Sequence, residues 1–388
     1  MAKNKNKKHQ AGSGPAVSSS TITFRQKLVL VVCSVLLVLV LGELGIRTRD
    51  ALFKGRGFFN DERNLVVNYR SLKPFRTFGP NLYNERNGVR YCRSVHEEYF
   101  SIKKPEGTFR IVCFGGSSTE NINSVKIDGT HYPLVLQNLL RAHYHRDNIE
   151  VINLGTSGYS TAHCLIMFEL DVLSWEPDLI IVSENINDLQ ASYFPNFTFD
   201  YSNKFSHPSY GLPNLRERFT VPNLLFQHSQ LYWEARREIL ALGRLIRGEK
   251  NVMHRKSLGE APLPEAVQVF ERNLKSFVYL ARPNGIGVLF GSQPLQPSEE
   301  YFNRHMQYKD YNDVAVYPLQ EEFVKHHQAF NESIRKVAEE TGSDFVENDG
   351  ALGGKEEYFI DLVHYTPAGV KKLAENYAEY IIGHSLVK

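Results

Sequence analysis

The sequence predicts a three-layer α/β/α fold with a mostly parallel five-stranded sheet, preceded by one N-terminal transmembrane helix. Two observations carry this prediction. In the second part of the 388-residue chain, five short apolar runs alternate with helical patterns, and such alternation builds βαβ units with helices on both faces of a parallel sheet. Near the start, residues 28–46 form one unbroken apolar run, which is long enough to span a bilayer as a helix.

The apolar run follows a basic head. Residues 1–27 carry six basic side chains and no acidic one, whereas the rest of the chain holds 39 basic and 43 acidic side chains. The positive-inside rule therefore predicts that residues 1–27 form a disordered cytoplasmic tail and that the chain after residue 46 is exported. The small acidic excess of the exported part argues against nucleic-acid binding.

Two alternatives for residues 28–46 are a cleaved signal peptide and a buried core helix. The head is long for a signal peptide, and no A-x-A-like cleavage site follows the run. A core helix normally has a polar face, which this run lacks. We therefore expect an uncleaved single-pass anchor in the cell membrane, with the catalytic part periplasmic or extracellular. Glu43 lies near the far end of the run, where its carboxylate can reach the headgroups.

Residues 47–108 contain three prolines and little periodicity, and we expect a stem followed by an irregular or β-rich lead-in. Residues 109–388 are expected to form one catalytic domain. Its strands are short apolar runs that end in glycine or polar residues, and its helices show apolar positions spaced by three and four. The expected strands are 109–115, 150–155, 178–183, 286–291 and 344–348, and the expected helices are 133–145, 162–174, 223–247, 264–282, 319–341 and 367–382. Residues 190–225 and 293–318 are expected as long loops, and the sequence leaves open whether they form a lid.

Polar residues follow the strands of this sheet in a set order. Gly115–Thr119 follows the first strand, Asn153–Ser160 the second and Glu184–Asp188 the third, while Asp361–His364 precedes the last helix. In parallel sheets the carboxyl ends of the strands share one edge, where functional sites lie. These four segments are therefore expected to converge.

The residue types suit nucleophilic acyl transfer. A serine on a glycine-flanked turn, here Ser117, is exposed and needs a base, for which His364 is the candidate. Asp361 is placed to orient that histidine. An oxyanion needs preorganised donors, which the amides of Ser117 and Gly158 and the side chain of Asn187 can supply. A phosphate-binding loop is excluded, because no Gly-Lys-Ser/Thr ending is present.

This arrangement resembles the SGNH (GDSL-type) hydrolase superfamily, in particular its membrane-anchored bacterial members, over about residues 109–383. The resemblance implies a flavodoxin-like sheet, Ser117 as nucleophile, His364 as base and Asp361 as its partner. It also implies Ser117, Gly158 and Asn187 as oxyanion donors. Three positions depart from the family pattern. Gly116 stands where many members have Asp, Asn185 replaces the Gly that usually begins the third block, and Tyr365 replaces a common Pro. Of these, Asn185 is the one that could crowd the oxyanion pocket.

Several other side chains are candidates for a role in binding a substrate, a metal or another cysteine. We expect Glu184 and Asp188 to be solvated loop carboxylates or helix caps rather than ligands of a substrate hydroxyl. The neighbouring pairs His326-His327 and His143/His145 do not make metal sites, and no metal or cofactor is predicted. Cysteines 92, 113 and 164 are expected to be buried thiols, although a bridge between the first and the third is possible.

Two stretches of the exported part have two interpretations each. Residues 236–256 are rich in basic side chains, which suit a solvated helix face, or contact with anionic polysaccharide or lipid headgroups. The aromatic residues of 190–225 suit stacking on sugar rings and a small satellite core equally well.

The leading hypothesis is a membrane-anchored, outward-facing serine esterase that removes an acyl group from a carbohydrate or another envelope ester. One alternative is an O-acyltransferase that uses the same triad on polysaccharide. A second is a catalytically silent binding or scaffold protein in polysaccharide export. The expected partners are an acylated carbohydrate or small ester and, through Leu28–Ile46, the membrane. The sequence leaves the acyl group, the alcohol and the oligomeric state open.

Overall fold

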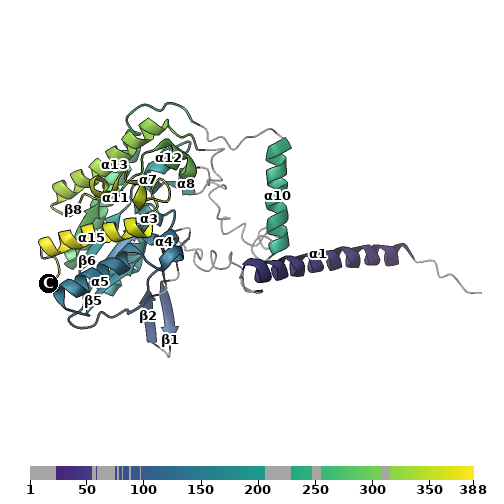
Figure 1. Cartoon of the computed structure of the whole chain (residues 1–388), viewed down its shortest axis with the longest axis horizontal. Coiled ribbons are helices and arrows are strands. Elements are labelled where there is room, and N and C mark those ends of the chain that lie inside the picture. Colours follow the sequence, from purple (N-terminus) through teal and green to yellow (C-terminus); the bar gives the residue numbers. More distant parts are fainter. Residues whose placement is uncertain are drawn as a thin grey trace, which may run out of the picture.

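A computed structural model describes residues 23–54, 58, 75–76, 78–80, 82–86, 89–96, 98–205, 229–246, 255–306 and 315–388 (Figure 1). Residues 1–22 of the predicted tail lie outside the described residues. So do residues 55–57 and 59–74 of the predicted stem. The same holds for residues 206–228 and 307–314 of the two long loops and for residues 247–254 of the basic stretch.

The centre of the fold is a five-stranded parallel sheet with strand order β5-β4-β6-β7-β8. Each strand is a short apolar run, as predicted. Its strands are β4 (Phe109–Gly115), β5 (Ile149–Asn153), β6 (Leu179–Ser183), β7 (Gly287–Gly291) and β8 (Asp344–Val346). The register pairs Cys113 with Asn153 and Gly115 with Ser183, so the carboxyl ends of β4, β5 and β6 lie together.

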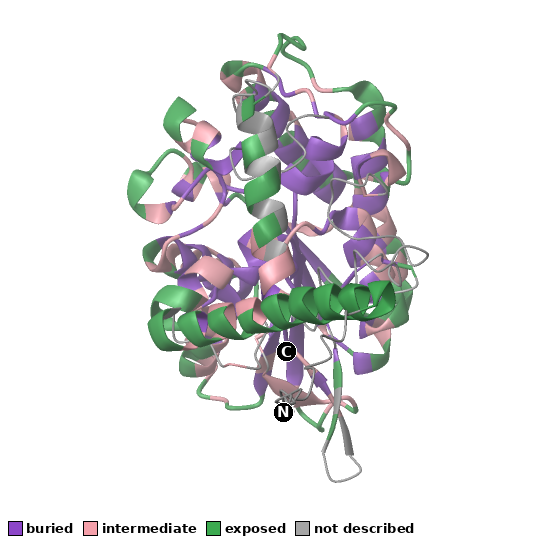
Figure 2. Ribbon diagram, turned by 90° about the vertical axis from the view of Figure 1, so that its right-hand side faces the viewer, coloured by how far each residue is buried: buried purple, intermediate pink, exposed green. Residues whose placement is uncertain are grey.

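Alternate strand residues point to opposite sides of the sheet. Since residues on both sides are apolar, helices cover both faces. Val112, Ile180 and Val182 belong to a core with α6 (Thr161–Leu170), α11 (Pro264–Ala281) and α13 (Gln320–Thr341). Ile111 and Ile181 belong to a second core with α5 (Tyr132–Tyr144) and α15 (Pro367–Gly383). Figure 2 shows the buried strands between these layers. The predicted α/β/α architecture is confirmed.

Shorter helices fill the connections. They are α3 (Ser117–Glu120), α4 (Ile122–Asp128), α7 (Ile186–Ala191), α8 (Ser202–Phe205), α12 (Glu299–Met306) and α14 (Asp349–Leu352), with 3-10 turns η1 (Val172–Trp175), η3 (Arg282–Asn284) and η4 (Glu356–Tyr358). Two predicted boundaries were wrong. The helix expected over 162–174 divides into α6 and η1. The loop expected over 293–318 contains α12, which at eight residues is too short to show a periodic pattern.

The lead-in contains a three-stranded antiparallel sheet made of β1 (Tyr83–Arg86), β2 (Val89–Arg93) and β3 (Tyr99–Ser101). The core that contains α6, α11 and α13 also includes Phe78, Leu82 and Cys92 from this region. The domain boundary at residue 108 stays a prediction, but these contacts tie the lead-in closely to the central sheet.

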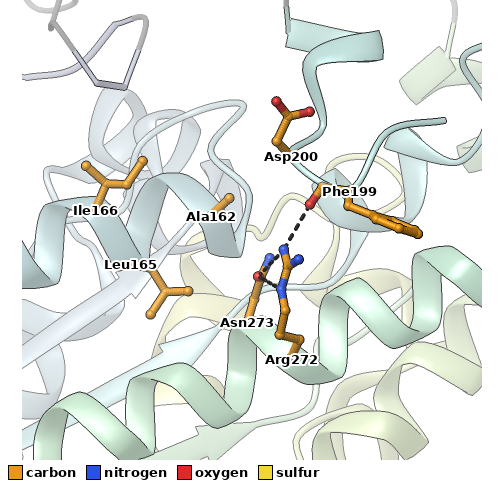
Figure 3. A pocket seen from close by; sticks show the side chains of 7 residues that line it. All are labelled: Ala162, Leu165, Ile166, Phe199, Asp200, Arg272 and Asn273. Atoms are coloured by element: carbon orange, nitrogen blue, oxygen red, sulfur yellow. Dashed lines mark hydrogen bonds between the residues drawn. The ribbon is translucent and has the colours of Figure 1, made fainter. Parts of the chain in front are cut away.

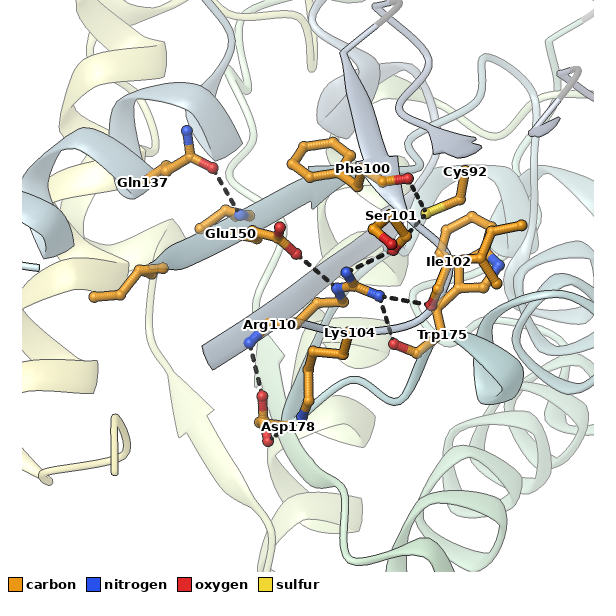
Figure 4. A network of polar contacts seen from close by, with 12 residues as sticks. Cys92, Phe100, Ser101, Ile102, Lys104, Arg110, Gln137, Glu150, Trp175 and Asp178 are labelled. Carbon is orange, nitrogen blue, oxygen red and sulfur yellow. Dashed lines mark hydrogen bonds and ion pairs between the residues drawn. The ribbon is translucent and has the colours of Figure 1, made fainter. Parts of the chain in front are cut away.

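The side chain of Arg110, at the start of β4, joins the lead-in to the sheet (Figure 4). Its buried guanidinium donates hydrogen bonds to Glu150 (2.8 Å) and to the carbonyl oxygens of Ser101 (2.8 Å) and Trp175 (2.6 Å). Asp178 accepts from the Arg110 backbone N–H and from Lys104 Nζ, both at 2.7 Å. A buried cation needs such a full set of acceptors. This network lies at the amino-terminal end of the strands, the end opposite the predicted site.

The first helix, α1 (Phe24–Lys54), lies apart from these layers (Figures 1 and 2). Among the described residues, Phe24–Phe53 is the stretch of helix long and apolar enough to cross a membrane. Its leucine and valine side chains are exposed along its length. It contacts α10 (Gln230–Ile246), the described part of the helix predicted over 223–247.

Candidate active site

Ser117 occupies the turn between β4 and α3, and its surroundings require glycine before it. A Cβ on Gly115 would overlap the side chain of Thr119 and the carbonyl oxygen of Ser183. A Cβ on Gly116 would overlap the side-chain atoms Asn187 Nδ2 and Glu184 Oε2. The chain can therefore make this close turn only without side chains at both positions. Ser117 itself is half-buried at the mouth of the turn.

Three predicted site residues from distant parts of the chain form one hydrogen-bonded row. His364 Nε2 lies 2.8 Å from Ser117 Oγ, and His364 Nδ1 lies 2.7 Å from Asp361 Oδ2. A serine, histidine and carboxylate in this order can activate the hydroxyl as a nucleophile, because the histidine can accept its proton and the carboxylate can stabilise the resulting imidazolium.

Asp361 is held by more donors than the sequence indicated. Its Oδ1 accepts the backbone N–H groups of Val363 and His364, both at 3.1 Å, and lies 3.3 Å from His305 Nδ1. Burial alone would raise the pKa of this carboxyl, but the hydrogen bonds from His305 and His364 outweigh burial and hold the pKa well below its usual range. Asp361 is therefore ionised at neutral pH.

His305 was missed by the sequence analysis, because it lies on α12, in a stretch that was expected to be a loop. Its imidazole ring centre lies 5.3 Å from that of His364. Candidate ligand atoms of His305, Asp361 and His364 lie within 4.8 Å of one another, close enough to hold a metal ion. A metal there would occupy the nitrogen or carboxylate atoms that connect Ser117, His364 and Asp361.

Candidate donors for an oxyanion lie next to Ser117. Asn187 Nδ2 is buried and has no hydrogen-bond partner among the described residues. Gly158 has φ of +81°, a conformation that favours glycine. The Tyr159 carbonyl oxygen would lie 3.3 Å from a Cβ on Gly116, so the second segment also reaches this turn. All four predicted segments thus meet at the carboxyl edge of the sheet.

Asn185 does not crowd this pocket. Its side-chain amide donates to the carbonyl oxygen of His327 and to Asn331 Oδ1, both at 2.9 Å. These partners belong to α13, so the side chain points toward that helix. The replacement of glycine at this position therefore adds a contact with the helical layer.

The expectation that Glu184 and Asp188 are solvated loop carboxylates was wrong, because both are buried. The expectation of a cap was correct for Glu184, whose Oε1 accepts the backbone N–H of Asn185 and Asn187 at the start of α7. Asp188 accepts from the backbone N–H and the hydroxyl of Thr161. Burial, together with the charge of Asp188, raises the pKa of Glu184 to about 8. Burial also raises the pKa of Asp188 to about 6.

A second layer of polar side chains holds the loops of the site in register. Glu120 Oε2 accepts both the backbone N–H (2.7 Å) and the hydroxyl of Ser157. Asn153 donates to the Thr119 carbonyl oxygen at 3.0 Å. These contacts fix the Gly158 segment against the Ser117 turn.

Gln293, at the end of β7, was also missed by the sequence analysis. It donates to the Ser118 hydroxyl at 2.9 Å and accepts the Ile186 backbone N–H at 2.9 Å. It thus bridges the turn of Ser117 and the helix of Asn187. A glutamine in a long polar loop carries no local signal of such a role.

A cavity of about 480 Å³ lies between α6, α11 and the segment around Phe199 (Figure 3). Its lining residues are Ala162, Leu165, Ile166, Phe199, Asp200, Arg272 and Asn273, and none of them belongs to the predicted triad or oxyanion donors. Phe199 is 58% exposed there, whereas Tyr193, Phe194 and Tyr201 are buried. Most of the described aromatic side chains of the predicted 190–225 loop are therefore part of the core, and Phe199 is the exposed exception.

The remaining predicted groups are structural. Cys92, Cys113 and Cys164 are buried free thiols, as expected. His326 and His327 are buried, and His326 contacts the Tyr193 hydroxyl at 3.0 Å.

The model of the GDSL-like Lipase/Acylhydrolase family matches residues 113–372. No curated protein matches the chain. Among solved structures, the chain is similar to a mutant of Axe2, an acetyl-xylooligosaccharide esterase from Geobacillus stearothermophilus. The identity is 17%, the match covers 72% of this chain and 96% of that one, and the TM-score is 0.41. It is also similar to LAE5, an alpha/beta hydrolase enzyme from the metagenome of Lake Arreo, Spain, at 15% identity, 73% and 97% coverage and a TM-score of 0.40.

Proposed function

The chain belongs to the GDSL-like lipase/acylhydrolase family and is an ester-cleaving hydrolase, and from that premise we propose that it is a membrane-anchored, outward-facing serine esterase. Its substrate class is an acylated carbohydrate or another ester of the cell envelope. The observation that carries the proposal is the row of short contacts from Ser117 through His364 to Asp361.

In the proposed reaction, Ser117 Oγ attacks the ester carbonyl carbon while His364 Nε2 accepts the hydroxyl proton. Asp361 stays ionised and stabilises the imidazolium. The tetrahedral intermediate collapses, His364 returns the proton to the leaving alcohol oxygen, and an acyl-serine remains. Water then attacks this ester with His364 as base again, which releases the carboxylic acid and restores Ser117.

The oxyanion of both intermediates is proposed to accept hydrogen bonds from the backbone N–H groups of Ser117 and Gly158 and from Asn187 Nδ2. The absence of a described partner for Asn187 Nδ2 supports this role, because a buried donor without an acceptor is costly unless a ligand satisfies it. Such donors act strongly when they are aimed in advance at the developing charge.

The anchor is proposed to be residues 28–46 within α1. Support comes from its exposed leucine and valine side chains, which are unfavourable in water and favourable in a bilayer. The basic head of residues 1–27 favours a cytoplasmic N-terminus. The catalytic domain then lies outside the cytoplasm, where carbohydrate esters of the envelope are accessible.

The proposal is tested by labelling the detergent-solubilised full chain with a fluorophosphonate probe and by assaying a generic acetyl ester. The wild-type chain should be labelled at Ser117 and should turn the ester over. Ser117→Ala should lose both while keeping the thermal midpoint, and Ser174→Ala, on the exposed side of η1, serves as the control that keeps both. Failure of the folded wild-type chain to react with the probe would reject the mechanism and favour a silent binding protein.

A further inference from the structure

The helix α10 exposes one apolar face. Leu231, Ala235, Ile239, Leu242 and Ile246 recur at intervals of three or four residues, which places them on one side of the helix. Exposed fractions are 68% for Ile239, 54% for Leu242 and 76% for Ile246. By position, the three arginines of the helix lie outside this stripe, and Glu238 lies at its edge beside Leu242. A row of large apolar side chains this exposed is typical of an interaction surface.

The amino-terminal end of α10 is fastened to the far end of the anchor. Glu43 accepts hydrogen bonds from the backbone N–H groups of Gln230 (3.0 Å) and Leu231 (2.9 Å) and from the Ser229 hydroxyl (2.9 Å). A carboxylate is favoured at a helix N-terminus, where it satisfies free N–H groups and meets the positive end of the helix dipole. The acidic residue of the apolar run therefore joins α10 to α1.

The same contacts show which side of α10 points toward the membrane. Leu231 packs over Gly42, where a Cβ would lie 3.1 Å from Leu231 Cδ2, while Glu234 pairs with Arg49 at 2.5 Å. Seven residues separate Gly42 from Arg49, about 10 Å along a helix. Since Gly42 lies within the apolar run and Arg49 lies beyond it, the face that carries Leu231 is turned toward the bilayer.

Figure 1 shows α10 running crosswise to α1, near the end of α1 that lies closest to the body. A helix crosswise to a membrane-spanning helix lies parallel to the membrane surface. The apolar stripe then faces the hydrocarbon and the polar residues face the headgroups and water, which is the arrangement of interfacial amphipathic helices.

We propose that α10 lies in the outer surface of the bilayer, with Ile239, Leu242 and Ile246 inserted between the lipid headgroups. This inference rests on the proposed anchor and adds a second membrane contact to it. Its consequence is that the catalytic domain is connected to the bilayer through α10 as well as through α1.

The test uses the full chain reconstituted in phosphatidylcholine vesicles with a minor fraction of phosphatidylglycerol. Cys33→Ser removes the one exposed cysteine, because the other three are buried thiols. A nitroxide is then attached at Ile239→Cys on the stripe, at Arg244→Cys as the matched control at a position on the opposite side of the helix, or at Val38→Cys in the anchor. Electron paramagnetic resonance measures collisions of each label with oxygen, which concentrates in lipid, and with a water-soluble nickel complex.

The ratio of oxygen to nickel accessibility should be several-fold higher at Ile239→Cys than at Arg244→Cys, and high at Val38→Cys. If the label at Ile239→Cys is as accessible to nickel as the label at the control position, while Val38→Cys is in lipid, the role of α10 is overturned and the anchor stands. A label shielded from both reagents also overturns that role, because it indicates a protein partner, such as a second copy. A water-exposed label at Val38→Cys overturns the anchor and this inference together.

Discussion

His305 Nδ1 lies 3.3 Å from Asp361 Oδ1, whereas the His364 side chain contacts the other carboxylate oxygen, Oδ2. The carboxylate is thus held from both sides by imidazoles of two different segments. A fixed carboxylate keeps the orientation of the His364 ring constant through the reaction, and we infer that His305 is a positioning residue.

Replacing His305 by Ala should lower kcat/KM for an acetyl ester by about tenfold, because a hydrogen bond to a charged group contributes about 1.5–3 kcal/mol. His305→Gln keeps a donor and should retain most of the activity. If both variants lose activity in proportion to a lower thermal midpoint, His305 serves packing alone.

Gly116→Ala should reduce kcat by about a hundredfold, the size of effect seen when one oxyanion donor is lost. The added Cβ would overlap Asn187 Nδ2 and Glu184 Oε2 and so displace the proposed donor. Gly383→Ala is the matched control, since nothing lies within 4 Å of its Cβ position. Steady-state kinetics on both variants decide the matter, and full activity of Gly116→Ala would contradict the proposed geometry.

Arg110→Met should lower the free energy of unfolding by about 3–5 kcal/mol, because it leaves Glu150 without its buried partner. Urea denaturation of the detergent-solubilised chain measures this loss. Lys371→Met, which removes an exposed and long ion pair with Glu375, should change stability by less than about 1 kcal/mol. Equal effects in the two variants would show that the Arg110 network does not stabilise the sheet.

Glu184 should make the chain less stable as the pH rises. Burial and the charge of Asp188 raise its pKa to about 8 from an ordinary value of 4.5. Between these two values the folded chain keeps a proton that the unfolded chain has lost. The free energy of unfolding should therefore fall with rising pH in this window, by at most about 1.4 kcal/mol per pH unit.

Glu184→Gln carries no titrating proton and should flatten that slope. Urea denaturation at pH 5, 6, 7 and 8 compares the two chains. Identical slopes would mean that Glu184 is ionised in the folded state.

The five strands and the meeting of the four segments could be predicted because both follow from local patterns and chain connectivity. Apolar runs of strand length locate β4, β5 and β6, and parallel strands bring their carboxyl ends to one edge. Ser117, Gly158 and Asn187 follow directly after those strands, so their neighbourhood is decided by connectivity. The long apolar helix α1 is likewise a matter of length and composition, which the sequence contains in full.

The tertiary structure alone decided which distant side chains complete the site. His305 reaches Asp361 only because α12 packs near the Asp361 segment, and Gln293 reaches Ser118 because the chain after β7 packs against the Ser117 turn. Asn185 turns away from the pocket because α13 offers it acceptors, and Glu184 is buried because the layers close over α7. Glu43 caps α10 across a long stretch of chain. Periodicity in a sequence reports which face of an element is apolar, whereas the partner of a buried polar group depends on how separate elements pack, and no local pattern encodes that.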